Sequence, residues 1–317
     1  MLRMFPVALF LAGACFPSFA AVDPSLLAMA PAQSQIVAAI NVEGSRSSAF
    51  GQFLLRQLSS HDDSFQQLVE QTGFDPRRDL QSILLTAVPP QSSKAQGRFA
   101  VLARGNFDQN RIKAAAQKQG SVVQHFQGVD LLAGNQGDEH IAFAFLDVDL
   151  AVMGDLLSVK QVIRNRANPA SLDPVLQNQI SKIESNDAWF ASISPPPSFI
   201  ANVDPDLKKS MDGAQALRSI VRSSGGIEFG GTSNVVFNAE TRSAQDATSL
   251  ADIIRFMASM LQMQRGKDGR AASLAPALDS MKLEVAGPSV HMAVHLPESV
   301  LEQLANMQDK PTARSMR

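Results

Sequence analysis

The sequence predicts an α+β fold made of two ferredoxin-like repeats, each with the order β-α-β-β-α-β-β-α, in which mainly antiparallel strands carry helices on one face. Short segments with alternating apolar residues are separated by turn signals, and longer segments with helical spacing lie between them. The same order of segments occurs twice along the 317 residues. We expect the first repeat over residues 33–167, a connector over 168–186, the second repeat over 187–307 and a disordered polar tail over 308–317.

The elements of the first repeat follow from local signals. A strand is expected over 36–42. A helix with an apolar stripe follows it from about residue 50, and after a polar break at residues 61–63 a second helical pattern continues to Gly73. The later elements, in chain order, are strands near 82–88 and 98–104, a helix between Asp108 and Gly120, strands near 121–126, 129–133, 141–146 and 150–153, and a helix capped by Asp155.

The second repeat has the same order without the hairpin over 141–153. After a short connector helix that begins at Asp173-Pro174, the expected elements are a strand at 188–193, a helix at 211–222, strands at 226–229 and 234–239, a helix at 244–264, strands at 282–285 and 290–296, and a helix from Pro297. Gly225-Gly226 and Gly230-Gly231 are interpreted as hairpin glycines, because no Gly-Lys-Ser/Thr follows and the flanks read as strands.

The first twenty residues predict export. Arg3 provides a positive n-region, an apolar run extends from Met4 to Cys15, and small residues precede a peptidase site between Ala20 and Ala21. The apolar run is shorter than the roughly 20 residues that cross a bilayer, so we expect no transmembrane helix in the mature chain. The protein is therefore expected in the periplasm or outside the cell.

A second interpretation of the same segment depends on Cys15. Ala12-Gly13-Ala14-Cys15 loosely resembles a lipoprotein box, in which acylated Cys15 would become the new N-terminus and anchor the protein to a membrane. Otherwise the only cysteine of the chain is removed with the signal, and the mature protein has no disulfide and no thiol nucleophile.

Composition excludes some classes of function. Cleavage leaves 317 − 20 = 297 residues with 28 − 1 = 27 basic and 30 acidic side chains, a net charge of −3. No stripe of basic and aromatic residues is present, so nucleic-acid binding is not expected. No hydrolase elbow, zinc-protease motif or dinucleotide fingerprint occurs, so the sequence predicts no cofactor, no metal site and no recognisable catalytic residue.

His291 and His295 have the spacing of a helical zinc pair, but the residues around them alternate as in a strand. Four residues at about 3.3 Å each place the two imidazoles roughly 13 Å apart, too far for one metal ion. We expect two surface histidines on the polar side of that strand.

The helix over 244–264 carries an unusually wide apolar arc. Phe256, Met260 and Met263 lie beside the stripe that a helix normally buries. We expect burial of this helix between two lobes, and the alternative is a Met-rich patch that contacts a partner or ligand.

Several short motifs carry a resemblance to a known group. They are Thr72-Gly73-Phe74-Asp75 with Arg78-Asp79-Leu80, the run from Ala103 to Asp108, and Val152-Met153-Gly154-Asp155. With them the chain resembles a broad group of exported bacterial proteins that contain a domain of unknown function. The resemblance implies the duplicated α+β architecture and the export, and it brings no catalytic residues.

Three functional classes follow. The first is an exported, non-catalytic binding or scaffold protein that contacts an envelope protein, and the absence of a reactive motif favours it. The second is a carrier of a small apolar ligand in the cleft between the lobes. The third is an envelope hydrolase that assembles dispersed residues such as His125, His291 or Asp79 into a pocket.

Overall fold

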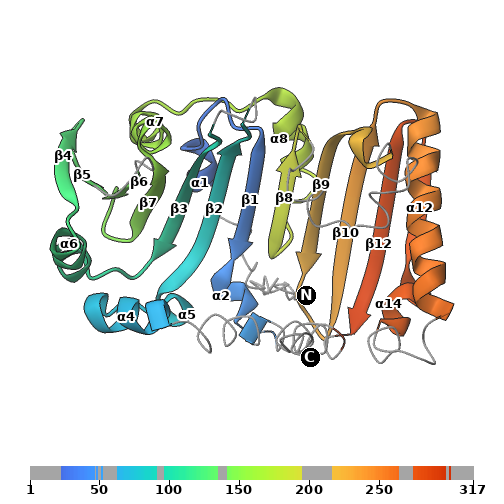
Figure 1. Ribbon diagram of the computed structural model, residues 1–317, viewed down its shortest axis with the longest axis horizontal. Helices are drawn as coiled ribbons and strands as arrows, with labels where there is room; N and C mark the ends of the chain where they lie inside the picture. The colour runs from blue at the N-terminus through green and yellow to red at the C-terminus, as the bar shows by residue number, and fades with distance from the viewer. Residues whose placement is uncertain are drawn as a thin grey trace, which may run out of the picture.

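The alternating segments form one antiparallel sheet of twelve strands in the computed structural model, with the order β11-β12-β10-β9-β8-β1-β2-β3-β7-β6-β5-β4 (Figure 1). The structure describes residues 23–46, 48, 51–52, 63–90, 96–134, 141–194, 216–263, 274–297 and 300. The α+β class and the antiparallel pairing are confirmed. The predictions for Cys15, Ala20, Ala21, the helix from residue 50, the helix from Pro297 and the tail over 308–317 concern segments that lie, wholly or in large part, outside these residues.

The strands match the expected segments to within a few residues, apart from one. They are β1 (Ile36–Asn41), β2 (Leu80–Val88), β3 (Arg98–Gly105), β4 (Val122–Phe126), β5 (Val129–Ala133), β6 (Ile141–Phe145), β7 (Leu150–Asp155), β8 (Ala188–Ser192), β9 (Ile220–Glu228), β10 (Thr232–Thr241), β11 (Lys282–Ala286) and β12 (Ser289–Pro297).

The described helices begin largely where capping residues predict. They are α1 (Pro24–Ala28), α2 (Val42–Ser45), α4 (Asp63–Thr72), α5 (Pro76–Asp79), α6 (Gln109–Lys118), α7 (Leu156–Ala167), α8 (Pro174–Ile180), α12 (Ala244–Met263) and α14 (Ala275–Ser280). Asp108, Asp155 and Asp173 each accept a hydrogen bond from a backbone N–H in the first turn of α6, α7 and α8. These three caps are confirmed.

The exception is β9. The sequence predicts a helix over 211–222, whereas Ile220 and Arg222 already pair with Thr241 and Glu240 in the sheet. That prediction is wrong for residues 220–222, because Ile220 is buried in the cluster that joins α12 to the sheet, and this tertiary packing outweighs local helical spacing. The interpretation as hairpin glycines is wrong for Gly225-Gly226, since both lie within β9, and is confirmed for Gly230-Gly231, which lie in the turn between β9 and β10.

Helices pack on both sides of the sheet. In the larger core cluster, Leu84, Leu102 and Trp189 contact apolar side chains of α1, α7 and α8, and we call this side the reverse face. In the smaller cluster, α12 packs on Ala239 and Val290, whose side chains point to the other side. The expectation of helices on one face is therefore wrong, since α8 and α12 lie on opposite sides of the second half of the sheet.

The two halves are joined edge to edge rather than forming two sheets. Strand β1 begins the first half and pairs antiparallel with β8, which begins the second, so the sheet is continuous across the boundary. Ferredoxin-like repeats are not confirmed, because a split βαβ unit contains parallel strands and every pairing found is antiparallel.

Candidate binding site on the apolar face of the sheet

One face of the sheet carries apolar side chains from edge to edge. Residues directly opposite each other on paired strands point to the same side, so the strand register defines rows that cross the whole sheet. The first row contains one residue from each of the twelve strands, in sheet order from β4: Val123, Leu132, Phe143, Met153, Val101, Leu85, Ala38, Phe190, Gly225, Phe237, Met292 and Leu283. No side chain in this row can form a hydrogen bond.

A second row on the same side has the same character. It runs from β6 to β12 through Phe145, Ala151, Ala103, Ile83, Ile40, Ala188, Ile227, Val235 and Val294. We call the side that carries both rows the apolar face. An antiparallel sheet normally has one apolar and one polar side. Strands β1, β2, β3 and β8 depart from this pattern, because their other side is also apolar and belongs to the larger core cluster.

Gly225 lets two aromatic rings approach each other on this face. It stands between Phe190 and Phe237, and a Cβ at this position would lie 2.9 Å from the Phe190 ring and from the Val236 carbonyl oxygen. The centroids of the two rings are 6.3 Å apart. Glycine therefore keeps the aromatic pair continuous across the middle of the second half.

Aromatic side chains close the end of the apolar face near β6. Phe143 and Phe145 meet edge to face with centroids 4.8 Å apart, Phe107 lies 5.6 Å from Phe145, and Phe74 stacks on Phe107 at 5.2 Å. Phe107 precedes α6 and Phe74 follows α4, which are the helices at the left of Figure 1. The apolar face therefore ends in an aromatic wall there.

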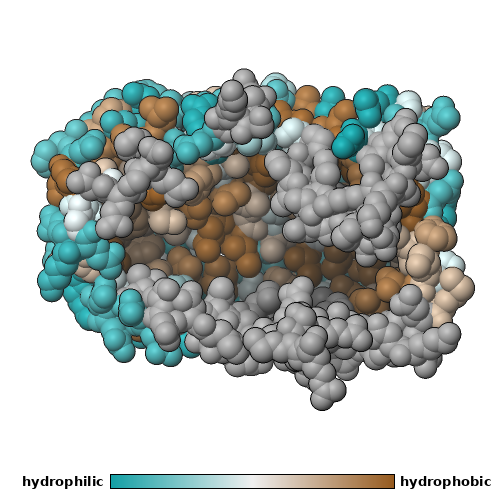
Figure 2. Space-filling model, in the orientation of Figure 1, coloured by the Kyte–Doolittle hydropathy of each residue, from teal (hydrophilic) through white to brown (hydrophobic). Residues whose placement is uncertain are grey.

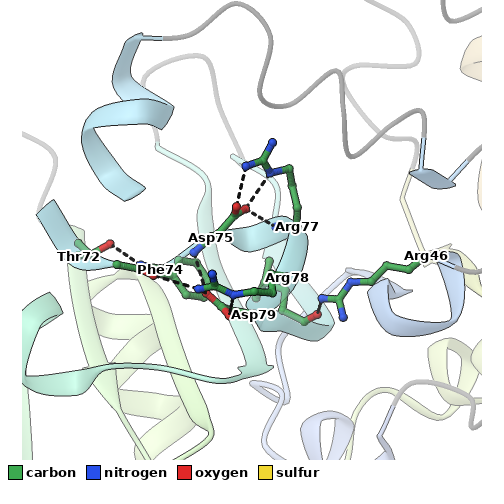
Figure 3. Close-up of polar contacts among 9 residues, drawn as sticks. Arg46, Thr72, Phe74, Asp75, Arg77, Arg78 and Asp79 are labelled. Carbon is green, nitrogen blue, oxygen red and sulfur yellow. Dashed lines mark hydrogen bonds and ion pairs between the residues drawn. The ribbon is translucent and has the colours of Figure 1, made fainter. Parts of the chain in front are cut away.

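Two arginine–aspartate pairs hold the turn that carries Phe74 (Figure 3). Asp75 caps α5 and accepts hydrogen bonds from Arg77, at 2.9 Å from Nε and 2.6 Å from Nη2. Asp79 accepts from Arg78 Nε at 2.7 Å and from the backbone N–H of Asp75 at 2.8 Å. The motif from Thr72 to Leu80 is thus a structural turn, and it places no acid near a substrate cavity.

The arginines lower the pKa of both carboxyl groups. The hydrogen bond from Arg77 is the main cause for Asp75, and the hydrogen bond from Arg78 is the main cause for Asp79, while burial acts in the opposite direction in each case. A carboxyl group with a lowered pKa in the folded state contributes stability above its unfolded pKa of about 4 and loses it as the pH falls through the folded pKa.

We therefore expect Asp79→Asn to destabilise the protein by about 1 kcal/mol at pH 7, and we expect this difference to shrink below about pH 4. Urea unfolding of both proteins between pH 7 and pH 3 measures it. The exposed pair Arg255–Asp252 provides the control, since Asp252→Asn should cost at most about 0.5 kcal/mol. A destabilisation by Asp79→Asn that stays constant with pH would contradict this assignment.

Helix α12 closes the opposite end of the apolar face, at the right of Figure 1. Its Leu250 and Ala251 are buried against the sheet. Phe256, Met260 and Met263 point away and are 61%, 40% and 72% exposed, so the expected burial of this side of the helix between two lobes is not found. Their role as a partner or ligand patch stays a prediction.

Between these ends the middle of the apolar face is open. Leu85, Val101 and Phe190 are half-buried and Met153 is 44% exposed, although the side chains next to them in sequence, such as Leu84 and Leu102, are fully buried on the reverse face. Figure 2 shows this region as a hollowed hydrophobic area over the centre of the sheet. A contiguous, partly accessible apolar area of this kind is typical of interaction and ligand-binding surfaces.

The residues named for catalysis are far apart in the sheet. His291 and His295 lie on β12 and hydrogen-bond through Nδ1 to Asn238 and Asn234, as expected for separate surface histidines. His125 pairs with Asp130 at 2.7 Å, but this pair is on the edge strands β4 and β5 and the His125 side chain is 80% exposed. None of these groups joins Asp79, which is held by Arg78.

Comparison with known proteins finds solved structures with a similar fold but no matching family. No known protein family matches the sequence, and no curated protein matches it either. The fold is similar to that of TP0453. Crystal form III of that protein superposes with a TM-score of 0.52 at 8% identity, over 88% of this chain and 97% of that chain. Crystal forms I and IV give TM-scores of 0.49 and 0.48 at 9% identity, over 92% and 88% of this chain and 100% and 96% of theirs.

Within the ranges that the structure describes, no helix is long and apolar enough to cross a membrane.

The sequence contains a signal for the apolar face that alternation of apolar and polar residues does not reveal. Ile83-Leu84-Leu85 and the run from Phe99 to Ala103 are apolar at every position, and so is the run from Ile36 to Ile40. A strand that is apolar at every position has two buried or buriable sides. These runs identify the strands of the open area, although they do not show which side stays open.

Proposed function

We propose that this protein is a non-catalytic binding protein whose ligand is a hydrocarbon chain, such as the acyl chain of a lipid, bound along the middle of the apolar face. The observation that carries the proposal is the pair of cross-strand rows without a single hydrogen-bonding side chain, half-buried in the middle and closed at both ends. The ligand surface is this face, because the two halves share one sheet and leave no cleft between separate lobes.

The chemistry of the apolar face favours a hydrocarbon chain over an extended peptide. A peptide that adds to a sheet needs unpaired backbone groups at an edge strand, whereas the backbone of β1, β2, β3 and β8 is paired on both sides. A ligand on this face meets side chains only, and those side chains offer dispersion contacts and removal of apolar surface from water. A hydrocarbon chain has no polar groups, so its burial on this face leaves no hydrogen bond unformed.

The direct test uses the purified mature protein. After expression in bacteria, native mass spectrometry before and after organic extraction should show a retained lipid, and the extracted protein should bind a fluorescent fatty acid such as parinaric acid with saturation at one or a few sites. Octanoate should compete more weakly than palmitate, because each further buried methylene contributes about 0.8 kcal/mol. An extracted, folded protein that binds none of these fatty acids would contradict the proposal.

A hydrolase is the less favoured class. In the described part of the chain, the histidine–carboxylate pair His125–Asp130 lies on the edge strands β5 and β4, where the His125 side chain is 80% exposed. A binding role in the cell envelope with a protein partner stays compatible with the exposed patch formed by Phe256, Met260 and Met263.

We propose that the protein acts outside the cytoplasm after removal of its first twenty residues. The intact mass of the protein isolated from its native host should correspond to a chain that begins at Ala21, because Ser18 and Ala20 provide the small residues a peptidase requires. A mass that fits an acylated Cys15 would instead support the lipoprotein, and the full-length mass with Met1 would contradict export.

We also propose that the two halves derive from one duplicated unit. From the centre of the sheet outward, the second half has the strand order β8-β9-β10-β12-β11. The first half has the equivalent order β1-β2-β3-β5-β4, with the hairpin strands β7 and β6 inserted between β3 and β5. Such a duplication would double the width of the apolar face, which suits a long ligand.

A further inference from the structure

The reverse face of the second half contains a cavity that the apolar face does not share. It lies between α8 and the strands β9, β10 and β12, and its volume is about 690 Å³. Its wall is formed by Asn178, Gln179 and Lys182, from α8 and the turn that follows it, and its floor is the sheet. Pockets for small molecules generally have volumes of about 300–1,000 Å³, so the size suits a metabolite.

The floor of the cavity is a grid of polar side chains from three adjacent strands. One cross-strand row contains Arg222, Glu240 and Ser289, and the next row contains Ser224, Asn238 and His291. The same side of the sheet is apolar and covered by helices in the first half. The change from an apolar to a polar floor therefore coincides with the cavity.

Hydrogen bonds within the floor fix the imidazole. Asn238 Oδ1 lies 2.6 Å from His291 Nδ1, and the Asn238 amide nitrogen lies 3.5 Å from Ser224 Oγ. Because a carbonyl oxygen can only accept, Nδ1 carries the proton and Nε2 is the nitrogen left for a ligand. The ring is oriented before any ligand arrives.

The two cationic side chains of the cavity, Arg222 and Lys182, have N–H donors that are available to a ligand. Arg222 contacts Glu240 through Nη1 alone, at 3.0 and 2.8 Å, so its other guanidinium nitrogens can still donate. The ammonium group of Lys182 has no carboxylate partner among the residues that the structure describes. With two cations and one carboxylate, the cavity has a net positive charge.

The wall of the cavity also contains a buried polar atom without a hydrogen-bond partner in the described part of the chain. Gln179 Oε1 is buried and accepts no hydrogen bond from any residue in the described part of the chain. A buried acceptor without a donor costs about 1–3 kcal/mol, and such groups normally find a partner. A simple solvated strand face would not bury such an oxygen beneath a helix.

We propose that this cavity binds a small hydroxylated organic anion, such as a sugar acid or a sugar phosphate. Lys182 and Arg222 bind the anionic group through charge-assisted hydrogen bonds, while Glu240 and His291 Nε2 accept hydrogen bonds from hydroxyl groups. Val236 and Ile183 provide the apolar contacts of the pocket. This site is independent of the apolar ligand on the other side of the sheet.

Titration calorimetry of the mature protein with gluconate and with glucose 6-phosphate tests the proposal. At least one of them should bind, and sorbitol and propionate, which lack the charge or the hydroxyl groups, should bind at least tenfold more weakly. The two anions distinguish a carboxylate from a phosphate ligand. Lys182→Gln should weaken the binding at least tenfold, whereas Lys118→Gln, an exposed lysine of α6, should leave it unchanged.

His291→Ala should also weaken the binding, with an unfolding midpoint in urea close to that of the unsubstituted protein because His291 is exposed. Trp189, the only tryptophan, packs with α8 on the same side of the sheet, so its fluorescence checks that the wall is intact in each variant. The proposal is overturned if neither anion binds. It is also overturned if the folded Lys182→Gln and His291→Ala variants bind the anion with the same affinity as the unsubstituted protein.

Discussion

Replacing Leu85 by glutamine is expected to weaken the binding of an acyl probe at least tenfold and to change the free energy of unfolding by less than about 1 kcal/mol. Leu85 lies in the first apolar row between Ala38 and Val101, at the centre of the open area. A bound hydrocarbon chain would have to bury the new amide without a hydrogen bond, which costs about 1–3 kcal/mol, and 1.4 kcal/mol corresponds to tenfold in affinity. Fluorescence titration of the delipidated protein measures the change.

A matched control is available in the turn between β6 and β7. Val148 is 77% exposed and belongs to neither apolar row, and its turn joins the second and third strands from β2 in the sheet, so Val148→Gln introduces the same amide away from the centre of the open area. Equal probe affinity in Leu85→Gln and Val148→Gln would place the ligand elsewhere and remove the main support for the proposed function.

Replacing the neighbouring Leu84 by alanine should have the reverse effect. The Leu84 side chain is fully buried on the reverse face, in the core cluster that contains Leu102 and Val152. Removal of a buried leucine costs the transfer free energy and leaves a cavity, about 2–5 kcal/mol in total. Urea unfolding should show this loss, and probe affinity measured where the variant is still folded should stay within about twofold of the unsubstituted value, because the side chain does not face the ligand.

Leu85→Ala completes this comparison, since it makes the same chemical change one residue along the same strand. We expect it to cost less than half as much stability as Leu84→Ala, because Leu85 is only half-buried. Equal destabilisation by the two alanine variants would mean that the apolar face is packed as tightly as the reverse face, and the open binding surface would then be wrong.

Most local elements could be predicted from the sequence because their signals are local. Asp108, Asp155 and Asp173 each mark a helix start through a side-chain oxygen that accepts a backbone hydrogen bond within three residues. Strand β9 could not be predicted in this way. Its first residues have helical spacing, and only the pairing of Ile220 with Thr241 and the packing of α12 give them extended structure.

The candidate site could be predicted only in part. Runs such as Phe99 to Ala103 show that both sides of a strand are apolar, but each row of the apolar face combines residues that are up to 254 positions apart in the sequence, such as Ala38 on β1 and Met292 on β12 in the first row. Register is set by the pairing of the whole sheet, and a shift of one residue in any strand would break the row. The same holds for the cavity beneath α8, whose two polar rows meet only through β9, β10 and β12.

The sequence by itself determined the class of fold, the antiparallel strands, the helix caps and the expectation of export, because hydrophobic period, capping residues and an N-terminal apolar run are properties of neighbouring residues. The tertiary structure alone decided that the two halves join through β1 and β8 into one sheet. It also decided that Leu84 is core while Leu85 is surface. Two identical side chains in one strand differ only in the side of the sheet to which they point and in what packs there, and that depends on segments distant in the chain.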